Sequence, residues 1–90
     1  MDTIKMQEDI RYVAGTMEDI PMFIMNDMSN NRFSLTDNIA VALKSPQKSA
    51  IKQVAKFYNQ ENIPRKFSIL PIKVTYQIID GDDNGTSGVN

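Results

Sequence analysis

The chain has 90 residues with a formal net charge of −1, and 41% of its residues are hydrophobic while 23% are charged. This composition is typical of one small globular domain and excludes a wholly disordered chain. The sequence contains no cysteine and no histidine, which excludes disulfides, thiol or imidazole catalysis, and zinc sites built from nitrogen and sulfur ligands.

Apolar residues near the amino terminus recur at helical spacing. Steps of four and three separate Met6, Ile10, Val13, Met17 and Ile20. This spacing predicts an amphipathic helix. Pro21 either kinks that helix or begins a second short one that ends near Met28, and Ser29, Asn30 and Asn31 then indicate a loop.

Two further helices are indicated in the middle of the chain. Residues 34–37 resemble a capping box, which predicts a helix over residues 35–44. Ser45 and Pro46 suit the cap and the first position of a following helix that ends near Gln60. The apolar arc of this last helix consists of Ala50, Ile51, Val54, Phe57 and Tyr58. Joined by so short a connection, the two helices resemble a helix-turn-helix motif.

The sequence period changes to two after Pro71. The apolar positions that alternate with polar ones are Ile72, Val74, Tyr76 and Ile78. This alternation predicts a half-buried strand. Three partners for the strand are open: residues 67–70 of the same chain, the same strand in a second copy, or a strand of another protein. We favour the second copy, which predicts a two-fold homodimer.

These elements predict a small α+β domain over residues 1–79 that is mainly α, with three to four short helices and one C-terminal β-strand. Residues 80–90 are rich in Gly and Asp, which predicts a disordered acidic tail. Residues 80–85 match only the first half of a calcium-binding loop, so no metal site is predicted. The first residues do not resemble a secretory signal, and no apolar run reaches the roughly 20 residues that span a bilayer. We therefore expect a cytoplasmic protein without membrane contact.

Basic residues are concentrated between positions 32 and 66, where acidic residues are few. Lysines at every fourth position from Lys44 to Lys56 place the last three on one face of the predicted helix. The simpler interpretation of this face is contact with solvent alone. The alternative is binding of nucleic acid, mainly through phosphates, because no arginine lies in the helix to read guanine. The candidate contact residues are Lys44, Gln47, Lys48, Lys52, Gln53, Lys56, Arg65 and Lys66.

A second candidate surface is apolar and rich in methionine. Its residues are Met17, Ile20, Met22, Phe23, Met25, Met28, Ile72, Val74, Tyr76 and Ile78. Core filling is the commoner use of such residues, but so small a domain has limited room to bury them all. Glu18, Asp19 and Asp27 would then form an acidic rim around a dimer or partner interface.

Catalysis is not indicated by the sequence. The adjacent carboxylates Glu8-Asp9 and Glu18-Asp19 diverge on a helix, unlike a converging acid–base pair, and no cofactor or metal site is evident. The sequence therefore predicts a small non-enzymatic regulatory or accessory protein, a homodimer, that contacts nucleic acid through the lysine-bearing helix. The alternative is an acidic, Met-rich interaction or assembly module that acts on a partner protein.

Overall fold

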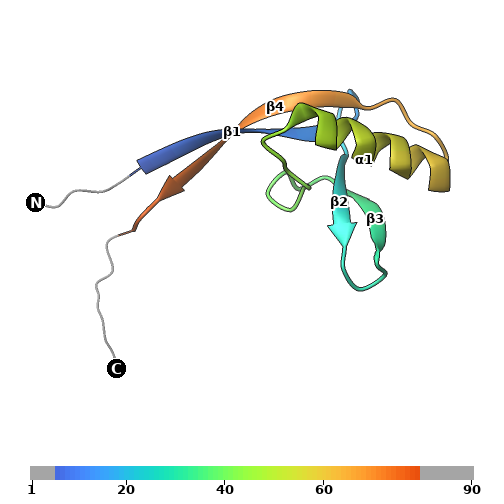
Figure 1. Cartoon of the computed structure of the whole chain (residues 1–90), viewed down its shortest axis with the longest axis horizontal. Helices are drawn as coiled ribbons and strands as arrows, with labels where there is room; N and C mark the ends of the chain where they lie inside the picture. Colours follow the sequence, from blue (N-terminus) through green and yellow to red (C-terminus); the bar gives the residue numbers. More distant parts are fainter. Residues whose placement is uncertain (1–5, 80–90) are drawn as a thin grey trace, which may run out of the picture.

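Residues 6–79 are described by a computed structural model. The elements are β1 (Met6–Gly15), β2 (Phe23–Asp27), β3 (Arg32–Thr36), α1 (Lys48–Glu61) and β4 (Ser68–Gln77). The strands form one antiparallel sheet in the order β3-β2-β1-β4, which is curled into a half-barrel (Figure 1). Strand accounts for 42% of the described residues and helix for 19%, so the expected mainly α fold is wrong.

The first predicted helix is the strand β1. Tyr12 packs in the apolar cluster on one face of the sheet, whereas Val13 is buried in the cluster on the other. A strand covered on both faces has a continuous apolar run, which hides the alternation that would have identified it. Two of the residues that gave the helical spacing, Met17 and Ile20, lie exposed in the loop after β1.

The second predicted helix is the strand β2, for the same reason. Phe23 is buried on one face of the sheet and Ile24 on the other, so neighbouring positions are both apolar. The predicted loop at residues 29–31 is confirmed as the turn between β2 and β3. Asn31 has a φ of 54° there, a left-handed conformation that asparagine tolerates better than most residues.

The third predicted helix does not form, because its first residues belong to β3 and residues 37–44 make irregular turns. Lys44 Nζ donates to the carbonyl oxygens of Ala40 and Ala42, at 2.9 Å each, and Asn38 Oδ1 accepts from the Ala40 amide at 3.0 Å. The predicted helix-turn-helix is therefore wrong, since only its second helix exists. That helix is confirmed as α1, although it begins at Lys48 and not at Pro46.

The predicted C-terminal strand is confirmed, and it extends back to Ser68, so that residues 68–70 belong to the strand and are not its partner. Its partner within the chain is β1: Met6 lies opposite Gln77, and Gly15 lies opposite Ser68. Pairing with a second copy is therefore not needed to complete this side of the strand. The residues predicted as a tail and a partial calcium loop, 80–90, lie outside the described residues.

Pro71 is accommodated in the middle of β4 by the register of the strand pair. Tyr12, which lies opposite Pro71, exchanges both of its backbone hydrogen bonds with Ser45, at 2.8 and 3.2 Å. In an antiparallel pair the residue opposite such a position also directs its backbone groups away from the partner. The missing N–H of Pro71 therefore faces the free edge of the sheet and removes no bond to β1.

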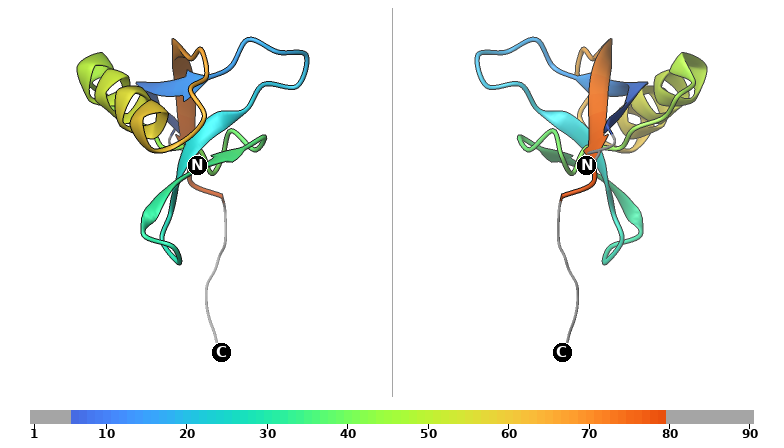
Figure 2. Two further views of the ribbon diagram at one scale, coloured as in Figure 1. Left: turned by 90° about the vertical axis from the view of Figure 1, so that its right-hand side faces the viewer. Right: turned by 90° about the vertical axis from the view of Figure 1, so that its left-hand side faces the viewer.

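Two layers cover the sheet near its centre. On one face, Ile51, Ala55 and Tyr58 of α1 pack against Ala14 and Ile24. On the other, the segment 37–44 contributes Ala42, which packs with Val13 and Phe23. Figure 2 shows α1 and that segment on opposite sides of the β1–β4 pair. This double coverage places the core at one end of β1 and β4.

The other end of β1 and β4 continues away from the core as a two-stranded ribbon (Figure 1). We call residues 6–11 of β1 and 72–77 of β4 the arm. Its apolar side chains Met6, Ile10 and Tyr76 are exposed. Among residues 6–79, no helix is long and apolar enough to cross a membrane.

Candidate nucleic-acid interface

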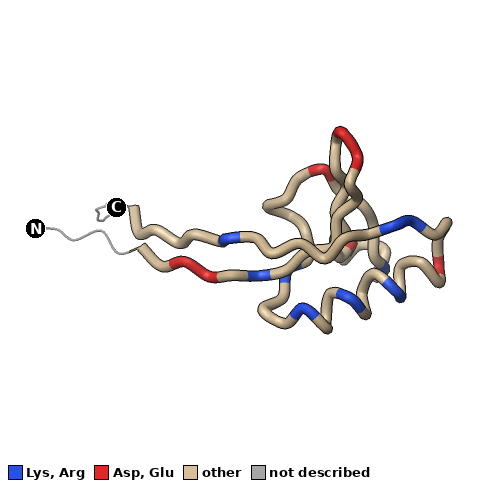
Figure 3. Tube along the Cα trace, turned by 90° about the horizontal axis from the view of Figure 1, so that it is seen from above, with Lys and Arg blue, Asp and Glu red and all other residues tan. Residues whose placement is uncertain are grey.

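The lysine face of α1 consists of Lys48, Lys52 and Lys56, all of them exposed. At 100° per residue these three side chains fall within an arc of roughly 80°. The buried residues Ile51 and Ala55 hold the neighbouring arc of the helix against the sheet. Figure 3 shows basic positions recurring along α1. Packing of α1 therefore fixes the lysine face on the outside of the molecule.

In the part of the chain that the structure describes, acids do not pair with the lysine face. Within residues 6–79, no salt bridge includes Lys48, Lys52 or Lys56. The first turn of α1 also has no acidic residue. Like charges four residues apart disfavour a helix by about 0.2–0.5 kcal/mol per pair. An anionic ligand would relieve this repulsion as well as gain the attraction.

Arg65 and Lys66 extend the lysine face beyond the end of α1. Asn59 falls within the same helical arc as the lysines. Its Nδ2 donates to the carbonyl oxygen of Arg65 at 3.0 Å, and its Oδ1 accepts from the Arg65 amide, also at 3.0 Å. These two bonds hold the basic segment against the helix, so that Lys66 lies next to the lysine face and is exposed.

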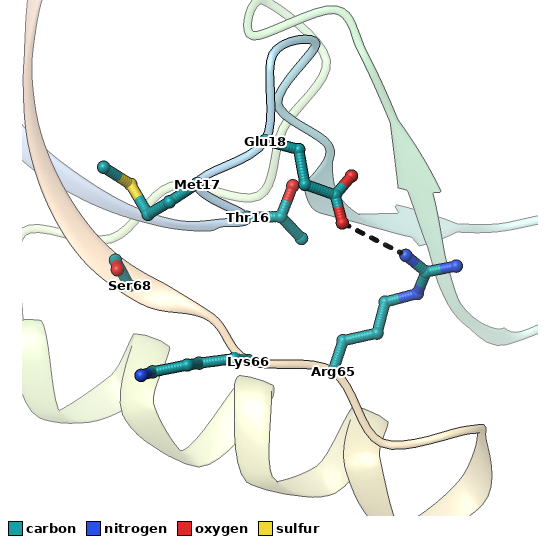
Figure 4. Close-up of a pocket in the computed structure, with 6 residues that line it drawn as sticks. All are labelled: Thr16, Met17, Glu18, Arg65, Lys66 and Ser68. Carbon is teal, nitrogen blue, oxygen red and sulfur yellow. Dashed lines mark ion pairs between the residues drawn. The ribbon is translucent and has the colours of Figure 1, made fainter.

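A surface cavity of about 450 Å³ adjoins this segment (Figure 4). Its lining residues are Thr16, Met17, Glu18, Arg65, Lys66 and Ser68. Figure 4 shows Arg65 and Glu18 pointing toward each other, with Arg65 Nη1 3.9 Å from Glu18 Oε2, whereas Lys66 extends away from them. The side chain of Thr16 is held in the lining of this cavity because its Oγ1 accepts a hydrogen bond from the backbone N–H of Met22 at 2.9 Å. Glu18 partly neutralises Arg65, and Lys66 is the stronger candidate for an anion contact.

The remaining predicted contact residues have different surroundings. Lys44 is separated from the lysine face, because its ammonium group is held by the carbonyl oxygens of Ala40 and Ala42. Gln47 precedes α1, and its backbone N–H donates to Ser45 Oγ at 3.1 Å. Gln53 is exposed on α1 beside the lysines. The structure thus places Lys48, Lys52 and Lys56 on one face of α1, with Gln53 about 60° beyond Lys56 around the helix. Lys66 follows the residue that Asn59 holds against the helix.

Sequence reasoning missed a second feature of α1, an exposed aromatic ring. Phe57 was predicted to be in the apolar arc, but 54% of it is exposed. It lies in a groove of about 250 Å³, and the other lining residues are Asn26, Asn31, Arg32, Phe33 and Glu61. The signal was present in the helical geometry, since Phe57 falls roughly 120° away from Ile51 at the centre of the buried arc.

The predicted apolar interface is distributed over separate parts of the structure. Phe23 belongs to the core, and Met22, Met25, Ile72 and Val74 are half-buried. The exposed members lie in the loop after β1, in the β2–β3 turn and at the end of the arm: Met17, Ile20, Met28, Tyr76 and Ile78.

The expected acidic rim is distributed in the same way. The carboxylate of Asp27 accepts hydrogen bonds from Ser29 and Asn30 in the β2–β3 turn. Glu18 pairs with Arg65, and Asp19 is exposed in the loop after β1. Within residues 6–79, no three acidic side chains gather in a way that could hold a metal ion.

Comparison with known proteins found no matching family model, no similar curated protein and no similar solved structure. A function is therefore inferred from the surface itself: a row of exposed lysines on α1 and the basic segment that adjoins it.

Proposed function

We propose that this chain is a small non-enzymatic accessory protein that binds nucleic acid through the lysine face of α1. The observation that carries the proposal is the exposure of Lys48, Lys52 and Lys56 with no salt bridge to any residue between 6 and 79. A net charge of −1 for the whole chain does not oppose it, because a polyanion responds to the local field.

The contacts would be mainly to phosphates. A lysine ammonium group is a compact point charge on a flexible stem, which suits a phosphate and does not read a base pair bidentately. Between Lys48 and Glu61 the helix contains no arginine, the residue best suited to guanine. The proposal is therefore for binding with little sequence preference.

The test is the salt dependence of binding to a short DNA duplex of mixed sequence, followed by fluorescence anisotropy. With three to four phosphate contacts, from the lysine face and Lys66, the slope of log K against log salt is roughly −2.7 to −3.6. The triple variant Lys48→Gln, Lys52→Gln, Lys56→Gln loses most of this slope and most of the affinity. Binding that is independent of salt, or unchanged in the triple variant, would contradict the proposal.

Matched single variants separate the lysine face from charge in general. Lys52→Gln lowers the magnitude of the slope by about 0.9, whereas Lys52→Arg retains it. Arg11→Gln removes the same charge from the face of the sheet opposite α1, because Arg11 alternates with the α1-facing residues of β1. Its binding equals that of the parent chain. An equal loss of affinity in Arg11→Gln and Lys52→Gln would show that net charge, and not the lysine face, determines the binding.

The second candidate is docking of a partner protein through the loop after β1. The observation in its favour is the exposure of Met17 (74%) and Ile20 (67%) on either side of two acidic residues, which suits a partner that is apolar with a basic rim. Double substitution of Met17 and Ile20 by serine distinguishes the candidates. Nucleic-acid binding stays intact in that variant if the lysine face is the functional surface.

A further inference from the structure

The outer edge of β4 is unpaired among the described residues, because β4 is the terminal strand of the sheet. The backbone directions along it follow from Tyr12, whose N–H and C=O are both bonded to Ser45 on the side away from β4. Alternate residues of an antiparallel pair share this orientation. The N–H and C=O groups of Lys73, Thr75 and Gln77 therefore point outward along the arm.

Apolar side chains line this edge. Tyr76 is 50% exposed and Ile78 67% exposed, and they follow Ile72 and Val74 on the same face of the strand. Lys73 would ordinarily discourage pairing at an edge. Its ammonium group, however, lies 3.6 Å from Glu8 Oε1 on the neighbouring strand, which partly neutralises it. The edge thus combines unpaired backbone groups with apolar side chains, as edges that accept another strand do.

We propose that the occupant of this edge is β4 of a second copy, paired antiparallel about a two-fold axis at Thr75. In this register Lys73 lies opposite Gln77 of the second copy. On the apolar face, Val74 lies opposite Tyr76 of the second copy and Ile72 lies opposite its Ile78. Every apolar side chain of the edge then meets another, and no like charges are opposed.

The registers centred on the adjacent outward-facing residues, Lys73 and Gln77, are less complementary. An axis at Lys73 places the two Lys73 side chains directly opposite each other, which is destabilising. An axis at Gln77 leaves Ile72 and Val74 without an apolar partner among the described residues. Pro71 has no N–H to donate and could contribute only its C=O, so the residue pairs that exchange two hydrogen bonds are confined to residues 73–77 of each copy.

The symmetry of this pairing has a consequence for the lysine face. A two-fold axis between antiparallel edge strands is perpendicular to the sheet, so each copy presents the same face on the same side. Both α1 helices therefore lie on one side of the joined sheet. That both lysine faces could contact one nucleic acid rests on the proposed function, whereas the pairing of the strands does not.

The test is sedimentation equilibrium of the full chain without nucleic acid, over a range of protein concentrations. Thr75→Pro removes the outward N–H and costs no bond to β1, since Thr75 has the same orientation as Pro71. Loss of the two symmetric hydrogen bonds weakens the dimer by roughly ten- to a hundred-fold. Thr75→Val keeps the N–H and is the matched control, with dimerisation like that of the parent chain.

A second measurement does not depend on any variant. Hydrogen exchange of the parent chain shows protection of the Lys73, Thr75 and Gln77 amides that increases with protein concentration, whereas the Val74 and Tyr76 amides do not change. A parent chain that is monomeric throughout, or a folded Thr75→Pro variant that dimerises as well as Thr75→Val, overturns the proposal. Because nucleic acid is absent, neither result bears on the lysine face.

Discussion

The two halves of the β1–β4 pair share one ladder and differ in what covers them. Residues 12–15 and 68–71 are enclosed by α1 on one face and by residues 37–44 on the other. The arm, residues 6–11 and 72–77, extends beyond this cover except at Ile72, which packs against the cluster of Val13, Phe23 and Ala42. Its larger side chains are mostly exposed. Since the backbone pairing is continuous, the difference between the halves is one of side-chain burial.

This comparison indicates where the stability of the fold resides. Buried apolar area is the dominant favourable contribution to folding, and a two-stranded ribbon alone is marginal in water. The covered half therefore carries the stability, and the arm opens at lower free energy. The ion pairs Glu8–Lys73 and Asp9–Arg11, at 3.6 and 3.0 Å, add little, because exposed pairs contribute about 0–1 kcal/mol.

The largest expected effect is the contrast between two isoleucines. Ile51 of α1 is 1% exposed and Ile10 of the arm is 54% exposed. Ile51→Ala leaves a cavity between α1 and the sheet and lowers the free energy of unfolding by about 2–5 kcal/mol. Ile10→Ala changes it by about 0.5 kcal/mol or less. Urea denaturation of both variants at a protein concentration where the chain is monomeric measures the difference, and equal losses would refute the division into two halves.

The next effect concerns Gly15, the residue of β1 that lies opposite both Phe23 of β2 and Ser68 of β4. A Cβ added there would lie 2.9 Å from Phe23 Cδ1 and 3.2 Å from Leu70 Cδ1, closer than packed carbon atoms approach. Gly15→Ala therefore destabilises the fold by about 1–3 kcal/mol through overpacking. Thermal denaturation measures the loss. In a double-mutant cycle with Phe23→Leu the two losses are less than additive, and strict additivity would show that Phe23 is not the obstacle.

The covered half is also where prediction from the sequence failed. The runs Tyr12–Ala14 and Phe23–Ile24 are apolar on consecutive positions because both faces of their strands are buried, and such runs carry no strand period. The arm half of β4, with one face more buried than the other, kept its alternation and was predicted correctly. Helix α1 was predicted because its period is a local property of its own residues, whereas the predicted start at Ser45 and Pro46 was wrong, since the N-cap position is Gln47 and no side chain caps it.

For the candidate site as well, the sequence predicted the residues whose positions follow from local spacing. Lys48, Lys52 and Lys56 follow from the period of α1 alone. The position of Lys44 depends on the turns of residues 37–44, which no local signal indicated. The exposure of Phe57 could have been predicted from the period of α1, because Phe57 falls roughly 120° away from Ile51.

A smaller effect separates the structural lysine from those on the surface. Lys44→Met keeps the aliphatic stem but loses the bonds to the Ala40 and Ala42 carbonyl oxygens, which lowers the free energy of unfolding by about 1 kcal/mol. It leaves the salt slope of nucleic-acid binding unchanged. Lys52→Met has the reverse pattern, with a slope smaller by about 0.9 and nearly unchanged stability. Denaturation and anisotropy on both variants measure this, and the same pattern in both would contradict the assignment.

The smallest effect lies in the β2–β3 turn, outside both halves of the β1–β4 pair. Hydrogen bonds from the side chains of Asn30 and Ser29, aided by their backbone amides, hold the pKa of Asp27 below its ordinary value. The charged carboxylate therefore stabilises the turn above the pKa of the unfolded chain, and this contribution is lost as the pH falls through the lowered pKa. Hydrogen exchange of the backbone N–H groups of Ser29 and Asn30 accelerates as the pH falls through that range. The Asp27→Asn variant shows no such acceleration. The carboxyl carbon shift of Asp27 follows the same titration by NMR, and a pKa at or above the ordinary value would show that the turn does not depend on the charge.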